Sequence, residues 1–155
     1  MPTPSPTPSP TPEVTPTALA TLLPAPSTHH AEAPHNRLLS ADGTLDTGVG
    51  IYTDCHGATE LPRYNAAIDT CVTDRTYFVG HNPGVFTPLF NEAIGALIAY
   101  WDATGTRHEL RIVARRSWPR DESGGLAPPV SSEVVAQFQT CISTTEELIL
   151  DAVPV

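Results

Sequence analysis

Turn-forming residues recur at short intervals along most of this chain and leave room between them only for short strands or a short helix. Glycine and pairs such as Asp-Gly mark turns because they adopt backbone conformations that most residues avoid. These signals stand at Asp42-Gly43, Gly48, Gly57, Gly80, Asn82-Pro83-Gly84, Gly95 and Gly105, and through residues 121–129. A chain divided in this way is predicted to form an all-β domain.

The segments between the turns are rich in β-branched and aromatic residues, which favour strands. Strands are predicted at residues 49–52, 75–79, 96–101, 108–113, 136–141 and 148–153. A short helix is predicted over residues 85–94, where Phe86, Leu89 and Phe90 share one face, although Pro88 weakens it. Many short strands predict a closed or nearly closed barrel, because closure removes exposed sheet edges.

The first part of the chain has a different composition. Residues 2–12 alternate proline with threonine or serine, and residues 1–34 hold more than half of the 17 prolines. Such a segment is predicted to be a disordered, extended spacer, because proline removes backbone donors and fixes φ. Residues 35–155 then form one domain, which is long enough to bury an ordinary core.

Charge and hydropathy limit the partners. Eight basic residues, all of them arginine, stand against 17 carboxylates and give a net charge of −9. Nucleic acid is therefore not an expected partner, because binding it requires clustered positive charge. The chain shows neither an apolar run of membrane-spanning length nor a signal peptide. If the protein is exported, its anchor or signal is missing from this sequence.

Two residues at the ends of predicted strands carry reactive groups. Cys141 ends one strand and His81 directly follows another, and rigid strands place such side chains reproducibly at a rim. From these two residues alone, a small buried cysteine and a turn histidine remain the alternative. Three cysteines allow three different pairings, each of which leaves one thiol free.

The ordered set of motifs resembles the sortase family over residues 37–155. The set comprises Gly80-His81 after an apolar strand, a short helical segment, a hairpin with a glycine-bearing tip, and Thr140-Cys141 followed by one last strand. The resemblance implies a closed eight-stranded barrel with one or two short helices. It also implies a loop over residues 117–132 that walls the substrate groove.

The resemblance implies a cysteine transpeptidase that needs no cofactor or metal. Cys141 would attack a sorting motif of a surface protein and form a thioester, which an amine of peptidoglycan or of a pilin would resolve. His81 would transfer protons, as imidazole can near neutral pH. Thr140 would help to orient the substrate or the oxyanion. The protein would then be extracellular, at a bacterial cell surface, with membrane contact only through the missing anchor.

One feature of the family is absent. Sortases carry an arginine at the start of the last strand, whereas residues 142–155 contain none and Glu146 and Glu147 stand there instead. A carboxylate would repel an oxyanion and disfavour a thiolate. One alternative is that Arg111, Arg115 or Arg116 reaches across the rim to Cys141, with Arg115 and Arg116 favoured because they are nearer the end of their strand. The other is that the domain is an impaired sortase that still binds peptides.

The remaining cysteines have two competing uses. We expect a Cys55–Cys71 disulfide that tethers the loop ahead of the His81 strand and leaves Cys141 free. A zinc site built from cysteine and histidine is disfavoured, because adjacent Cys55-His56 is a poor chelate. A peptidoglycan L,D-transpeptidase is the third candidate function, after the sortase-like enzyme and the peptide-binding module. The residues around Cys141 do not fit the setting of that family's cysteine.

Overall fold

The computed structural model describes Met1 and residues 33–120 and 125–155. Residues 2–32 of the predicted spacer lie outside the described residues. No helix in the described part of the chain is long and apolar enough to cross a membrane.

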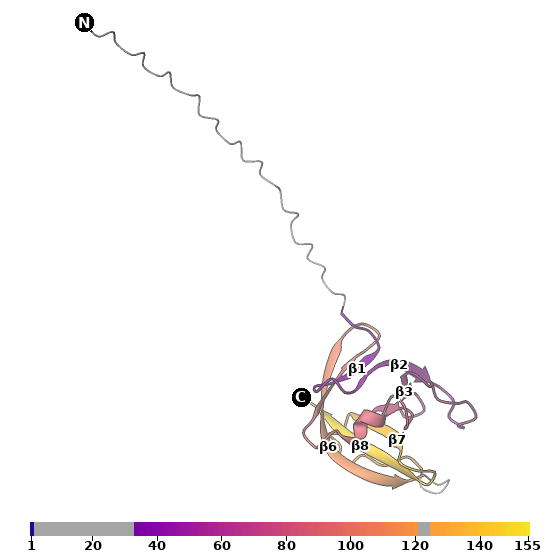
Figure 1. The fold of residues 1–155 in the computed structure, drawn as a ribbon. Coiled ribbons are helices and arrows are strands. Elements are labelled where there is room, and N and C mark those ends of the chain that lie inside the picture. The colour runs from indigo at the N-terminus through magenta and orange to yellow at the C-terminus, as the bar shows by residue number, and fades with distance from the viewer. Residues whose placement is uncertain (2–32, 121–124) are drawn as a thin grey trace. The chain divides into compact units, whose positions relative to one another are not determined.

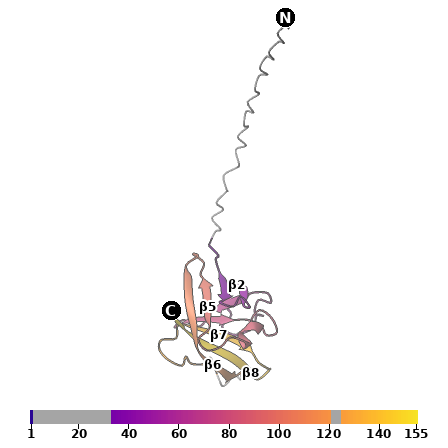
Figure 2. The same ribbon diagram turned by 60° about the vertical axis from the view of Figure 1, so that its left-hand side comes forward.

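Within these residues, eight strands form a closed barrel (Figures 1 and 2). Their order around the barrel is β1-β2-β3-β4-β7-β8-β6-β5. The β2–β3 and β4–β7 pairs are parallel and the other neighbours are antiparallel. The strands are β1 (Arg37–Ser40), β2 (Asp46–Tyr52), β3 (Ala66–Asp69), β4 (Thr76–Val79), β5 (Leu97–Trp101), β6 (Arg107–Pro119), β7 (Ala136–Cys141) and β8 (Glu146–Pro154). The predicted all-β, eight-stranded barrel is thus confirmed.

The barrel interior is filled by aromatic and aliphatic side chains. Phe78 of β4 and Phe138 of β7 are directly paired across the two strands, and their rings stack with centroids 4.9 Å apart. Tyr100 of β5 meets the Phe78 ring edge-on at 5.0 Å. Both phenylalanines are fully buried, so truncating either to alanine would cost about 3–5 kcal/mol.

The structure corrects three details of the sequence prediction. The helix predicted over residues 85–94 is only a 3₁₀ turn at Thr87–Phe90, with Pro88 in its first positions. Strand β6 continues to Pro119, six residues beyond the predicted end at residue 113, so the loop predicted from residue 117 starts later. Strands β1 and β3, of four residues each, had not been located individually.

Glu92 is a polar exception in the packed interior. It follows the 3₁₀ turn, is only 6% exposed, and its Oε1 has no hydrogen-bond partner within the described residues. Burial, helped by the nearby Asp42 carboxylate, raises the pKa of Glu92. An acid whose pKa rises on folding binds more protons in the native state than in the unfolded state. The free energy of unfolding therefore falls as the pH rises through the range above the unfolded pKa of about 4.3.

We expect Glu92→Gln to match the wild type near pH ~4 and to be more stable at neutral pH. The gain should be about 1 kcal/mol, the scale for a buried unsatisfied polar group. Denaturant unfolding at several pH values measures it, with the exposed Glu133→Gln as a control that should change little. A difference between Glu92→Gln and wild type that does not vary with pH would contradict this explanation.

Candidate functional site

The parallel pairing of β4 and β7 brings His81 and Cys141 to the same end of the barrel. The paired positions run from Thr76↔Ala136 to Val79↔Gln139, so His81 and Cys141 each lie two residues beyond the last pair. Both side chains therefore emerge at one rim, as the sequence predicted, although β5 and β6 separate their strands in the chain.

Hydrogen bonds extend this pairing beyond the strands. The Gly80 amide donates to the Gln139 carbonyl at 3.3 Å, and the Thr140 hydroxyl donates to the Gly80 carbonyl at 2.8 Å. The Asn82 side-chain amide donates to the Cys141 carbonyl at 2.8 Å. The segment that carries His81 is thus fixed to the segment that carries Cys141 on both sides of the histidine.

Gly80 has a packing role in this segment. A Cβ atom at this position would lie 2.7 Å from the ring of the fully buried Phe86, closer than real Cβ contacts. Only glycine lets the backbone before His81 approach the Phe86 ring so closely. The glycine that precedes the histidine is therefore required by the fold of the rim.

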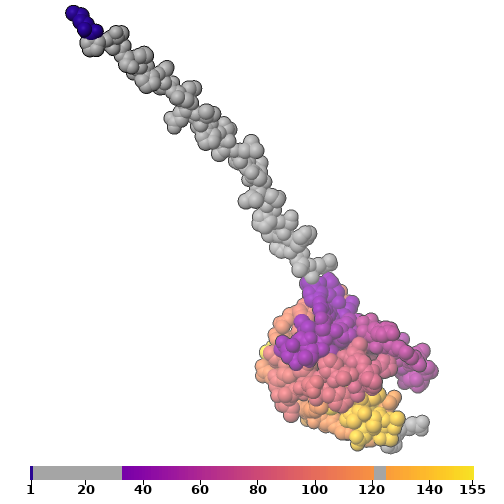
Figure 3. All heavy atoms as spheres, in the orientation of Figure 1, coloured from indigo at the N-terminus to yellow at the C-terminus, as the bar shows by residue number. Residues whose placement is uncertain are grey.

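His81 and Cys141 line one open groove with a volume of about 1120 Å³. Figure 3 shows the segment between β2 and β3 projecting beside a hollow, with the end of the β7–β8 hairpin across from it. We call residues 53–65 the β2–β3 loop. The other walls come from residues 83–85, Arg120, Leu126 and Gln139.

A disulfide between Cys55 and Cys71 lies in this wall, and Cys141 is a free thiol. This confirms the predicted pairing. The bond joins the β2–β3 loop to the residues that follow β3. It therefore restrains the loop opposite Cys141.

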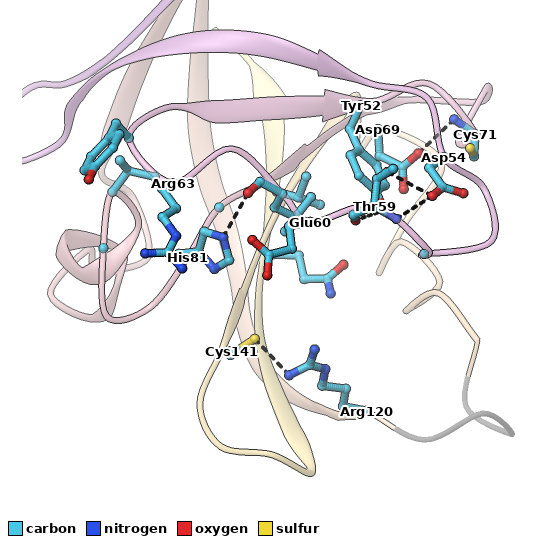
Figure 4. A pocket seen from close by; sticks show the side chains of 18 of the residues that line it. Tyr52, Asp54, Thr59, Glu60, Arg63, Asp69, Cys71, His81, Arg120 and Cys141 are labelled. Atoms are coloured by element: carbon cyan, nitrogen blue, oxygen red, sulfur yellow. Dashed lines mark hydrogen bonds between the residues drawn. The ribbon is translucent and has the colours of Figure 1, made fainter.

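Arg120 contacts the sulfur of Cys141. Its Nη1 lies 3.2 Å from Sγ (Figure 4). Its Nε lies 3.7 Å from the Glu147 carboxylate. Glu147 of β8 is paired with Cys141 on one side and with Trp118 of β6 on the other. One strand, β8, therefore separates the end of β6 from Cys141, and the long side chain of Arg120 reaches across it.

Arg115 and Arg116 were the predicted alternatives to this arginine, and the structure brings neither to Cys141. Arg115 donates to the carbonyls of Leu89 and Glu92. Arg116 pairs with the buried Asp151 at 3.0 Å and also donates to the Pro128 carbonyl, so it holds the β6–β7 connection against the barrel.

The prediction missed Arg120 because it ended the strand too early. With β6 ending at residue 113, Arg115 and Arg116 were the arginines nearest the rim. The strand runs on to Pro119, and the arginine next to its true end is Arg120. The signal that could have found it is the series Arg-Arg-Ser-Trp, which continues the strand up to the proline.

Glu147 was predicted to work against a thiolate, and its surroundings reduce that effect. Burial raises the pKa of Glu147, while the guanidinium of Arg120 acts in the opposite direction. The guanidinium of Arg120 contacts both this carboxylate and the sulfur, so the thiol has a positive charge beside it.

Thr140 does not face the groove. Its side chain is buried, and the hydroxyl is used to bind the Gly80 carbonyl rather than being presented to a ligand. The substrate or oxyanion contact predicted for Thr140 is therefore not supported by its position. Its contribution is to join the ends of β4 and β7.

These observations define a closed mixed β-barrel with a free thiol, an imidazole and a guanidinium in one open groove. No protein-family profile and no curated protein sequence matches the chain. Solved sortase structures do match its fold, so the chain has a sortase-like fold.

Three solved structures illustrate the match, each over 77% of this chain. Sortase A from Corynebacterium diphtheriae, a lid mutant, has a TM-score of 0.59 and 14% identity, with 68% of its chain covered. Sortase C1 from Streptococcus agalactiae has a TM-score of 0.59 and 13% identity, with 66% covered. Sortase C from Clostridium perfringens has a TM-score of 0.60 and 11% identity, with 68% covered.

We expect Arg120→Ala to slow alkylation of Cys141 by iodoacetamide at neutral pH about tenfold. The reason is that a charge-assisted hydrogen bond of about 1.5 kcal/mol to the thiolate is lost. Mass spectrometry over time measures the rate. Arg111→Ala, which removes an exposed arginine from β6, is the matched control and should leave the rate unchanged. Equal rates in all three proteins would show that Arg120 does not act on the thiol.

Proposed function

We propose that this chain is a sortase-like cysteine transpeptidase with Cys141 as nucleophile, His81 as proton-transfer group and Arg120 as the cation that stabilises charge at the reacting atoms. The observation that carries the proposal is the position of Arg120, 3.2 Å from the Cys141 sulfur in the groove that His81 also lines. The sortase-like fold supports the same function.

In the first half of the reaction, the Cys141 thiolate attacks a backbone carbonyl of the substrate peptide. A carbon–sulfur bond forms, and the tetrahedral oxyanion then collapses and breaks the carbon–nitrogen bond. Protonated His81 donates its proton to the leaving amine. The product is a thioester on Cys141 and a released peptide fragment.

In the second half, an amine attacks the thioester carbonyl. Neutral His81 accepts the proton that the attacking nitrogen loses, and the thiolate leaves as the new amide forms. These steps leave Cys141 as the thiolate and His81 protonated, the form in which the attack began. One histidine thus serves as acid and then as base.

No arginine follows Cys141 in the chain, and Arg120 can supply the missing positive charge. Its guanidinium can stabilise the thiolate that attacks and can donate to the oxyanion during attack. Because the residue after β6 supplies this cation, the glutamates of β8 do not by themselves argue for a module that only binds peptides.

The proposed substrate is a peptide sorting motif of a surface protein, and the proposed acceptor is an amine of peptidoglycan or of a pilin. One of the matched structures, a Clostridium perfringens sortase C, was solved with the C-terminal cell wall sorting motif. The open groove of this chain, with apolar side chains such as Leu61, Val85 and Leu126 around Cys141, suits an extended peptide. We propose a location at a bacterial cell surface for the same reason.

The test is to incubate the protein with a mixed-sequence peptide library and hydroxylamine, which converts any thioester to a peptide hydroxamate. We expect hydroxamates from a restricted set of sequences and, in a parallel incubation without hydroxylamine, an acyl adduct on Cys141 in the intact mass spectrum. Cys141→Ala should give neither, and His81→Ala should lower the yield about 100-fold or more.

Two results would contradict the proposal. One is a set of library peptides that bind the groove but never acylate Cys141, which would support the peptide-binding module instead. The other is hydroxamate formation that persists in Cys141→Ala.

A further inference from the structure

The β2–β3 loop makes a hydrogen bond to the ring of His81. His81 Nε2 lies 3.2 Å from the backbone carbonyl oxygen of Leu61, the contact drawn in Figure 4. A carbonyl oxygen can only accept a hydrogen bond, so this contact requires the hydrogen on Nε2. In the other neutral tautomer, the lone pair of Nε2 would face the lone pairs of the oxygen.

The part of the loop that precedes Leu61 is well ordered by its own bonds. The Asp54 carboxylate accepts from the amides of His56 at 3.0 Å and Thr59 at 2.6 Å, and from the Thr59 hydroxyl at 2.9 Å. The Tyr52 hydroxyl donates to the Thr59 carbonyl at 2.9 Å. Thr59 is thus fixed two residues before Leu61.

The disulfide adds a covalent restraint to the same loop. Cys55 lies next to Asp54, and its bond to Cys71 joins the loop to the segment after β3. The Cys71 amide in turn donates to Asp69 at the end of β3. The Leu61 carbonyl is therefore set, through the loop and the disulfide, by the barrel itself.

The β2–β3 loop contacts the ring of His81 through the Leu61 carbonyl. Within the described residues, the Leu61 carbonyl is the hydrogen-bond partner of the His81 ring. With Nε2 engaged as a donor, Nδ1 is the ring nitrogen that can release and accept a proton. The loop thus selects which nitrogen is chemically active.

We infer that the disulfide-held β2–β3 loop is a positioning element that fixes the Nε2–H tautomer of His81 and assigns proton transfer to Nδ1. This inference rests on the proposed function for the role of His81, but the tautomer itself does not depend on turnover. Loss of the Cys55–Cys71 bond should loosen the loop and weaken the tautomer preference. The site would then be sensitive to the oxidation state of a disulfide outside the reacting groups.

The test is ¹⁵N NMR of protein labelled at histidine, with His81→Gln used to assign the His81 signals. At a pH high enough that the His81 ¹⁵N shifts no longer change with pH, where the imidazole is neutral, Nε2 of the wild type should show the shift of a protonated nitrogen and Nδ1 that of a bare one. In Cys55→Ser/Cys71→Ser the two shifts should move towards each other as the tautomers mix. No substrate is needed.

A second pair of variants separates loop order from the disulfide. Asp54→Ala keeps the disulfide but removes the bonds to His56 and Thr59, and it should also mix the tautomers. Asp42→Ala is the matched control, because Asp42 makes the same kind of bonds to the Thr44 amide and hydroxyl in the β1–β2 turn, away from the groove. It should leave the His81 shifts unchanged. Backbone amide spectra show whether each variant is folded.

The inference is overturned if wild-type His81 carries its hydrogen on Nδ1, or if neither the disulfide variant nor Asp54→Ala moves its shifts. Should the double serine variant fail to fold, Asp54→Ala decides the matter. Failure of the proposed function is a separate result, seen as Nε2–H shifts as expected in a protein that forms no thioester with any peptide.

Discussion

The site depends on the parallel pairing of β4 and β7. Direct pairing and stacking of Phe78 on Phe138 fix the register of these strands in the barrel interior. A slip of one strand by one residue would turn its own buried ring out of the core and would move His81 away from the level of Cys141. The packing of two aromatic side chains thus sets the geometry of two polar ones at the rim.

The reactive groups come from different parts of the chain. β7 carries the thiol, the segment after β4 carries the imidazole, and the end of β6 carries the guanidinium. Arg120, the residue after β6, can reach Cys141 because only β8 separates them: Glu147 of β8 is paired with Cys141 on one side and with Trp118 of β6 on the other. A carboxylate beside a thiol becomes compatible with a thiolate when one arginine contacts both.

Much of this could be predicted from sequence, and the failures have physical causes. The barrel followed from short strands between turn signals, and β7 was located residue for residue. The strands β1 and β3 have four residues each, as β4 does, but they lack the run of β-branched and aromatic residues that marked β4. The predicted helix of ten residues is a single 3₁₀ turn, with Pro88 in its first positions.

The site was predicted in the same uneven way. His81 and Cys141 stand next to strand ends, which the sequence can indicate. Which residue beyond β8 reaches Cys141 depends instead on the register of β6, β8 and β7. Arg120 could not be placed without knowing that β6 continues to Pro119. The contact between His81 and Leu61 involves a backbone atom in a loop, which leaves no signature in side-chain patterns at all.

The most direct test of the account is whether position 81 and the Cys141 thiol are neighbours in solution. His81→Cys should let a short bifunctional thiol reagent such as dibromobimane bridge positions 81 and 141, with the product identified by mass spectrometry. Thr76→Cys, at the other end of β4, is the control and should give no bridge to Cys141. A protein in which His81→Cys and Cys141 are each modified but never joined would contradict the account.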